Sequence, residues 1–160
     1  MLLWFVGTAI IAVWFVFRDP RFDYRLLIVG ALLPLLDAVT GHAWVLHTLA
    51  FSLFLLLVVM VATMGRRPAR KALLAVPIGA LLHLVFDGAW TDADLFWWPL
   101  GGWSLADDRL PEAARGWWWD IALEVVGLVV LAWVWRRSGL SDRSARRRFR
   151  ADGRLLTEVR

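Results

Sequence analysis

The sequence predicts an all-α, polytopic helical membrane protein with about five transmembrane segments. Hydrophobic residues make up 60% of the chain, its mean hydropathy is +0.61, and apolar runs recur along its length. At 160 residues the chain is about one domain long, and a soluble domain of that size is usually much less apolar. The apolar runs are residues 1–17, 26–39, 47–64, 72–90 and 118–135.

Four of these runs are long enough to cross a bilayer, which takes about 20 residues with a tolerance of a few. The run 26–39 is short and contains Pro34 and Asp37, so it predicts a tilted or re-entrant half-span as an alternative to a full crossing. We therefore expect a helical transmembrane domain over residues 1–135, followed by an Arg-rich cytoplasmic tail over residues 136–160.

Basic residues predict the orientation of the segments. The successive loops carry three, none, four, two and nine Lys or Arg residues, so positive charge alternates between the two sides. By the positive-inside rule the N-terminus lies outside, residues 65–71 and the tail are cytoplasmic, and residues 40–46 and 91–116 are extracytoplasmic. Seventeen arginines against one lysine are typical of a GC-rich bacterial genome. The expected location is a bacterial cytoplasmic (inner) membrane, crossed several times.

Tryptophan indicates the same layout, because indole side chains favour the headgroup region of a bilayer. Eight of the twelve tryptophans fall at or near the expected outer boundary: Trp44, Trp90, Trp97, Trp98, Trp103, Trp117, Trp118 and Trp119. They predict an interfacial aromatic belt, or alternatively an aromatic wall around a lipid headgroup or glycan.

The tail accounts for the high isoelectric point. Nine basic and three acidic residues give residues 136–160 a charge of nine minus three, or +6. Anionic lipid headgroups attract such a segment by roughly 1 kcal/mol per basic residue, so membrane lipids are the expected partners. No nucleic-acid-binding motif accompanies this charge, and we expect no nucleic-acid partner.

All three histidines lie near aspartates beside apolar runs. His83 and Asp87 are four residues apart, so on a helix both project from one face about one turn apart. Asp37 ends the second run, His47 opens the third, and His42 lies between them. An ionisable residue within a membrane span is costly, so several at a similar depth indicate a shared purpose.

These five residues are the predicted metal ligands. Since the chain has no cysteine, any metal must be held by imidazole and carboxylate, which suits zinc, or alternatively manganese or iron. Glu124 lies about two turns inside the last run, at the expected depth of His83, and could bind a second ion, orient a ligating imidazole or act as the general base. Asp37 is the other candidate base. Asp92 and Asp94 lie in a loop, where acids are mostly solvated surface.

The residues of this group resemble a known family pattern, which runs approximately Pro-Asp-x-Asp, His-Arg-x-x-Thr-His-Ser, Gly-x3-His-x3-Asp and an aromatic-Pro element. This chain has the corresponding segments in the same order, at residues 34–37, 42–48, 79–87 and 97–99. Over roughly residues 26–100 it thus resembles the YdjM-like family of bacterial inner-membrane proteins (the DUF457 group), which are described as membrane-bound metal-dependent hydrolases.

The resemblance implies metal ligation by Asp37, His42, His47, His83 and Asp87, and it is silent on Glu124. The chain departs from the pattern at Leu35, where the family has an aspartate, and at Ala43, where it has an arginine. The missing acid, together with the absence of a histidine from the first run, would reduce a two-ion centre to one ion or abolish binding.

The sequence therefore favours a membrane-embedded metal-dependent hydrolase that acts on a phosphate or ester bond of a lipid or lipid-linked substrate at the outer leaflet. The main alternative is a non-enzymatic membrane scaffold or accessory protein, in which the His/Asp cluster is interhelical polar packing. Transport of protons or metal ions is less favoured, because the ionisable groups cluster at one leaflet rather than tracing a path across the membrane.

Overall fold

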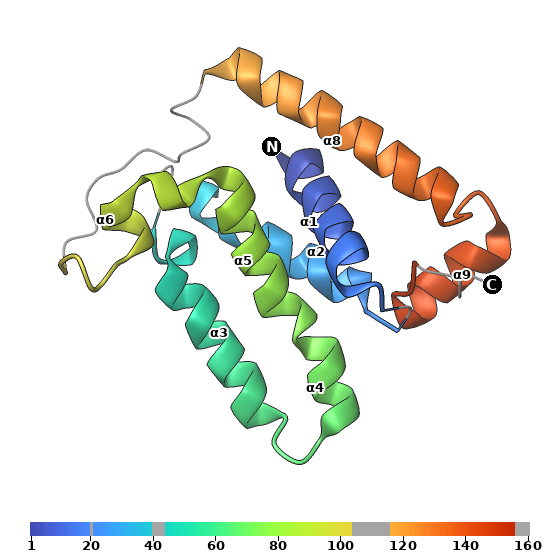
Figure 1. Ribbon diagram of the computed structural model, residues 1–160, viewed down its shortest axis with the longest axis horizontal. Helices are drawn as coiled ribbons and strands as arrows, with labels where there is room; N and C mark the ends of the chain where they lie inside the picture. Colours follow the sequence, from blue (N-terminus) through green and yellow to red (C-terminus); the bar gives the residue numbers. More distant parts are fainter. Residues whose placement is uncertain (20, 40–43, 104–115, 156–160) are drawn as a thin grey trace.

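The computed structural model describes residues 1–19, 21–39, 44–103 and 116–155, and these residues form helices and connecting turns with no β-strand (Figure 1). The all-helical prediction is confirmed. In chain order the elements are α1 (Leu2–Phe17), α2 (Tyr24–Leu32), the 3-10 helices η1 (Leu33–Val39) and η2 (Val45–His47), α3 (Leu49–Ala62), α4 (Arg67–Leu73), α5 (Ala75–Asp87), η3 (Ala89–Thr91), α6 (Ala93–Phe96), α8 (Trp117–Arg137) and α9 (Arg143–Asp152).

Proline sets two of the helix boundaries. The second predicted run divides into α2 and η1 at Leu33, one residue before Pro34. The stretch Arg67–Asp87 likewise divides into α4 and α5 at Leu74. Pro77 has no N–H to donate to the carbonyl of Leu73, four residues earlier, so the helical hydrogen-bond ladder is interrupted there.

The centre of the molecule is the close crossing of α2 and α5, which glycine makes possible. A Cβ added to Gly79 would lie 2.7 Å from the backbone nitrogen of Ala31 and would overlap with the carbonyl oxygen of Leu27. On the facing helix, a Cβ on Gly30 would overlap with the backbone of Val76. Helices within membranes commonly pack through small residues in this way.

A second close contact joins α1 to α8. A Cβ on Gly127 of α8 would overlap with the backbone of Leu3 and Trp4 in α1, and one on Gly7 would lie 3.1 Å from a methyl group of Val130. Between the two crossings lies the hydrophobic core, whose most deeply buried large side chains are Phe5, Val13, Tyr24, Leu27 and Leu84.

Two helical stretches of 21 residues, Arg67–Asp87 and Trp117–Arg137, are long and apolar enough to cross a membrane by length and composition. Helices α1 and α3 are apolar but shorter, with 16 and 14 residues. Only 11% of the apolar window of α8 is buried inside the molecule, so this helix is not a core helix of the chain. Its exposed apolar side chains include Ile121, Val125, Val126, Leu128, Val129 and Trp133.

The Arg-rich segment after α8 is folded onto the rest of the molecule. Leu140 and Leu155 belong to the same hydrophobic cluster as α1 and α2, and Phe149 packs against it. The guanidinium of Arg25 donates hydrogen bonds to the carbonyl oxygens of Arg150 and Ala151 at 2.5 and 3.0 Å. Helix α9 therefore lies against the end of the bundle where α1 ends and α2 begins (Figure 1).

The basic loops gather at that same end. The Lys71 ammonium at the end of α4 lies 2.6 Å from the Asp19 carboxylate in the α1–α2 connection. This hydrogen bond lowers the pKa of Asp19 below its ordinary value. At the opposite end, the indole of Trp4 donates to the carbonyl oxygen of Phe86, so the start of α1 lies beside the end of α5.

Candidate metal centre

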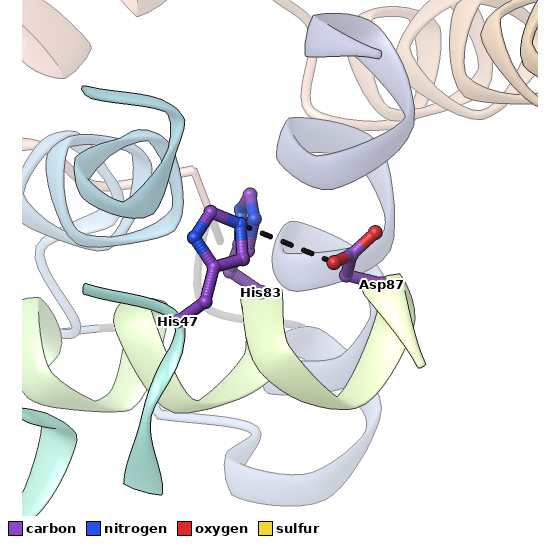
Figure 2. A group of neighbouring side chains, drawn as sticks. All are labelled: His47, His83 and Asp87. Carbon is purple, nitrogen blue, oxygen red and sulfur yellow. Dashed lines mark ion pairs between the residues drawn. The ribbon is translucent and has the colours of Figure 1, made fainter. Parts of the chain in front are cut away.

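Three side chains meet where η2, α2 and α5 converge. His47 is the last residue of η2, and His83 and Asp87 lie one turn apart on α5, as their spacing predicted. One ligand atom from each lies within 4.8 Å of the other two (Figure 2). All three are almost fully buried, with exposed fractions of 0% for His47, 1% for His83 and 0% for Asp87.

The His47 ring is held from behind by Asp37. Its Nδ1 atom lies 2.9 Å from Oδ2 of Asp37, and the same oxygen accepts a hydrogen bond from the backbone N–H of Trp44 at 3.0 Å. Local structure supports this position, because Thr48 is extended and its hydroxyl caps α3 by accepting from the N–H of Phe51, so η2 ends at His47 and α3 begins two residues later. Asp37 thus orients a candidate ligand and is not a member of the three-residue group.

The His83 ring is held by backbone. Its Nδ1 atom lies 2.7 Å from the carbonyl oxygen of Ala31 in α2. Because a carbonyl oxygen can only accept, Nδ1 carries the proton, and the lone pair of the neutral ring lies on Nε2. The ring of Phe5 from α1 stacks on the imidazole with a centroid distance of 3.8 Å. The Ala31 carbonyl therefore fixes the tautomer, and the contacts from α2 and α1 fix the orientation of this α5 side chain.

The two Nε2 atoms are the unusual feature of the site. Both are buried, and neither makes a hydrogen bond within the part of the chain that the structure describes. Buried polar atoms are nearly always satisfied, so two such nitrogens beside one carboxylate require an explanation. Imidazoles that bind a metal through one nitrogen usually donate the other N–H to a carboxylate or a backbone carbonyl, as Asp37 and Ala31 allow here.

The separations suit one ion. His47 Nε2 lies 4.0 Å from Oδ2 of Asp87, and the centroids of the His47 and His83 rings are 5.4 Å apart. Two ligand atoms bound at about 2.0–2.2 Å around a tetrahedral zinc ion are roughly 3.4 Å apart. Closing the group onto an ion thus needs His47 Nε2 and Asp87 Oδ2 to approach by 4.0 minus 3.4, or about 0.6 Å, and no pair of ligand atoms by more than 4.8 minus 3.4, or about 1.4 Å. The nitrogen and oxygen donors fit zinc.

Other predicted residues lie elsewhere. His42 falls outside the described residues. The Glu124 carboxylate accepts hydrogen bonds from the backbone N–H groups of Leu2 and Leu3 and lies 3.7 Å from the amino group of Met1. It therefore caps the start of α1, satisfies N–H groups that have no partner within their own helix, and is not part of the metal-ligand group.

The loop acids have a local role. Asp92 caps the short helix α6 by accepting from the N–H groups of Asp94 and Leu95, both at 3.2 Å. Two groups that contact the site were not predicted from the sequence, namely the Ala31 carbonyl and the Phe5 ring. No sequence signal marks a particular carbonyl, and Phe5 is one of many similar side chains on an apolar helix.

The fold and this group together define an all-helical protein with a buried His47–His83–Asp87 cluster that could hold a metal ion. Comparisons of the chain with protein-family models, curated proteins and solved structures found no match. The resemblance to the YdjM-like family therefore stays a prediction.

Proposed function

We propose that the chain is a multi-pass membrane protein in which His47, His83 and Asp87 bind one divalent metal ion, and that this centre hydrolyses a phosphate or ester bond of a lipid or lipid-linked substrate. The observation that carries the proposal is the pair of buried Nε2 atoms facing Asp87, each on a ring whose Nδ1 is already engaged.

Insertion into a membrane is supported by α8, which is 21 residues long and exposes most of its apolar surface. A contiguous exposed apolar face of this kind is unusual on a soluble monomer. The basic loops gather at one end, and tryptophans are exposed at the start of α8 and beside α5 and η2, among them Trp44, Trp90 and Trp118. This arrangement agrees with a cytoplasmic end that is basic and an outer end that is aromatic.

Hydrolysis is supported by the number of ligands. Three protein ligands leave a zinc ion with an open coordination position, which catalytic zinc sites keep and structural sites fill. A divalent ion held there supplies Lewis-acid chemistry, since it polarises a phosphoryl or carbonyl oxygen and lowers the pKa of water. Asp37, which lies 2.9 Å from His47 Nδ1, would keep this ring in its ligating orientation. Zinc is the first choice, with manganese or iron as alternatives.

The complete burial of the three side chains favours a second candidate function, a structural cluster in a non-enzymatic scaffold or accessory protein. Polar packing between helices without a metal would leave the histidine nitrogens hydrogen-bonded to each other or to neighbouring groups. The unsatisfied Nε2 atoms of His47 and His83 favour a bound ion over metal-free packing.

The test is elemental analysis of the protein purified in mild detergent without added chelator, followed by an assay of phosphate and fatty-acid release from phosphatidic acid and phosphatidylglycerol. His83→Gln removes one ligand, and Asp92→Asn is the matched control, because Asp92 is a nearby acid with a capping role. One equivalent of metal and turnover in the wild type and control, with both lost in His83→Gln, support the hydrolase.

Two other results separate the candidates. One equivalent of metal without turnover of either lipid would identify a structural metal centre and refute hydrolysis of these phospholipids. No metal in the wild type, and none taken up from added zinc, would refute both forms of the metal proposal and leave interhelical polar packing.

A further inference from the structure

Helix α9 presents a row of four arginines on one face. Arg143, Arg146, Arg147 and Arg150 follow the spacing i, i+3, i+4, i+7 and line a cleft of about 490 Å³. Like charges three or four residues apart on a helix repel one another and destabilise it. A folded helix that places four guanidinium groups around one space therefore calls for a counter-charge in that space.

The opposite face of α9 fixes the orientation of this row. Ala145 is buried, and Phe149 packs against the hydrophobic core. The backbone at the end of the helix is tied to α2, since Arg25 donates to the carbonyl of Arg150 and the N–H of Tyr24 donates to the carbonyl of Gly153 at 2.9 Å. The arginine row thus belongs to a docked helix rather than to a free extension.

In the described residues the arginine row has no acidic partner. Within the described part of the chain, none of the four guanidinium groups forms an ion pair with a carboxylate. The helix contains five arginines and one acid, Asp152, so its formal charge is five minus one, or +4. Arg146 is oriented by hydrogen bonds to the carbonyl oxygens of Leu140 and Ser141 at 3.0 and 2.9 Å.

The position of α9 selects the counter-ion. Helix α8 ends at Arg137, α9 begins six residues later, and it lies against the basic end of the bundle (Figure 1). If α8 crosses a membrane, the arginine row lies at the level of the lipid headgroups. Guanidinium groups bind phosphate oxygens through paired, charge-assisted hydrogen bonds, and several of them surround a phosphate better than lysines would.

We propose that the arginine row of α9 is a binding site for the phosphate group of an anionic phospholipid headgroup. The inference rests on the membrane insertion contained in the proposed function, but not on the metal centre. It goes beyond a general attraction between a basic tail and an anionic surface, because it assigns one lipid to one cleft on a folded helix.

The test compares two double substitutions that remove equal charge. Arg143→Gln with Arg147→Gln alters the cleft at two side chains that make no hydrogen bond in the described structure, and Arg148→Gln with Arg154→Gln removes two exposed arginines outside it. Binding of phosphatidic acid is measured by native mass spectrometry of the detergent-solubilised full chain. The expected loss of affinity is at least roughly tenfold for the cleft variant, because it loses charge-assisted hydrogen bonds to the phosphate, and about twofold or less for the control.

Equal losses in the two variants would overturn the proposal, because they would indicate diffuse electrostatic attraction. Glycerol 3-phosphate and a 20-nucleotide oligothymidylate are offered as competitors. If either binds as tightly as phosphatidic acid and loses affinity in the cleft variant, the ligand is a soluble phosphate or a nucleic acid, and the lipid assignment is wrong. Failure of both competitors to displace the lipid supports it.

Folding is checked by circular dichroism of each variant without lipid. Should the cleft variant fail to fold, amide hydrogen exchange of the wild-type α9 with and without phosphatidic acid decides, since slower exchange supports the site and unchanged exchange overturns it. Metal content is measured on the same samples, so a failed metal centre is distinguishable from a failed lipid site. Recovery of the chain in the soluble cell fraction would instead refute membrane insertion.

Discussion

Replacing Gly79 by alanine tests whether the α2–α5 crossing builds the metal centre. The added Cβ would lie 2.7 Å from the nitrogen of Ala31 and closer still to the carbonyl oxygen of Leu27, whereas ordinary contact begins at 3.4 Å, so the helices must separate by at least 3.4 minus 2.7, or 0.7 Å. A displacement of that size along the hydrogen bond from His83 Nδ1 to the carbonyl oxygen of Ala31 would stretch it from 2.7 Å to at least about 3.4 Å, beyond the usual limit of about 3.2 Å for an N–H···O bond.

We expect two measurable consequences of Gly79→Ala. Overpacking costs about 1–3 kcal/mol and the lost hydrogen bond about 1 kcal/mol, so the free energy of unfolding should fall by about 2–4 kcal/mol. Loss of the group that orients His83 should weaken metal binding by about 10–100-fold. The first effect is read from denaturation in detergent, and the second from calorimetric titration of the apoprotein with zinc.

Gly101→Ala is the matched control, because the nearest atom to a Cβ there is 3.9 Å away. It should change neither quantity. The reasoning is refuted if Gly79→Ala binds zinc as tightly as the wild type and unfolds at the same denaturant concentration, because the crossing would then tolerate a Cβ and would not position His83.

Three further predictions concern groups around the site and at the basic end. Asp37→Asn keeps an acceptor for His47 Nδ1 but removes its charge, so zinc affinity measured by titration should fall by roughly tenfold while the circular dichroism spectrum is unchanged. Glu124→Ala removes the cap of α1 and should lower the free energy of unfolding by about 1–2 kcal/mol without changing the metal content. Loss of turnover at wild-type stability would instead indicate that Glu124 acts as the general base. Because Lys71 lowers the pKa of Asp19, their pair stabilises the fold above the unfolded pKa near 4 and is lost as pH falls through the folded value. Both groups are partly exposed, so in an acid titration Lys71→Met should reduce this pH dependence by less than about 1 kcal/mol, and an unchanged titration would contradict the assignment.

The sequence was sufficient for the parts of the site that depend on local periodicity. Four-residue spacing places His83 and Asp87 on one face of any helix, and the apolar runs set where helices form. Predicting that His47 lies beside them required a further expectation, namely that ionisable residues at a similar depth in a membrane protein form one site. The structure confirms that these three side chains meet.

The remaining roles depend on contacts between distant segments. Every residue carries a carbonyl, so no signal could single out Ala31 as the partner of His83. An aspartate at position 37 could either bind the metal or orient His47, and the choice depends on the direction of its side chain, which the residue type does not reveal. Glu124 reaches a helix end 122 residues away along the chain, and only the α1–α8 crossing makes that contact available.

The Arg-rich segment shows the same limit. Its composition indicates charge, but the docking of α9 depends on a few apolar residues, Leu140, Ala145, Phe149 and Leu155, among many polar ones. Because so few apolar residues dock this helix, their helical spacing is hard to recognise in a sequence segment dominated by arginine. The sequence therefore predicted a basic tail and not a folded helix.

The position of the three candidate ligands along the chain gives a bound ion a topological effect. His47 and His83 are 36 residues apart, so an ion shared between them would close a loop that contains α3, α4 and most of α5. A covalent cross-link over that length would stabilise the fold by roughly 4 kcal/mol, because it lowers the conformational entropy of the unfolded chain. This value is an upper bound for the stabilisation by a reversibly bound ion. Chelation would then loosen the α3–α4 hairpin first, and the earliest rise in amide exchange should appear there.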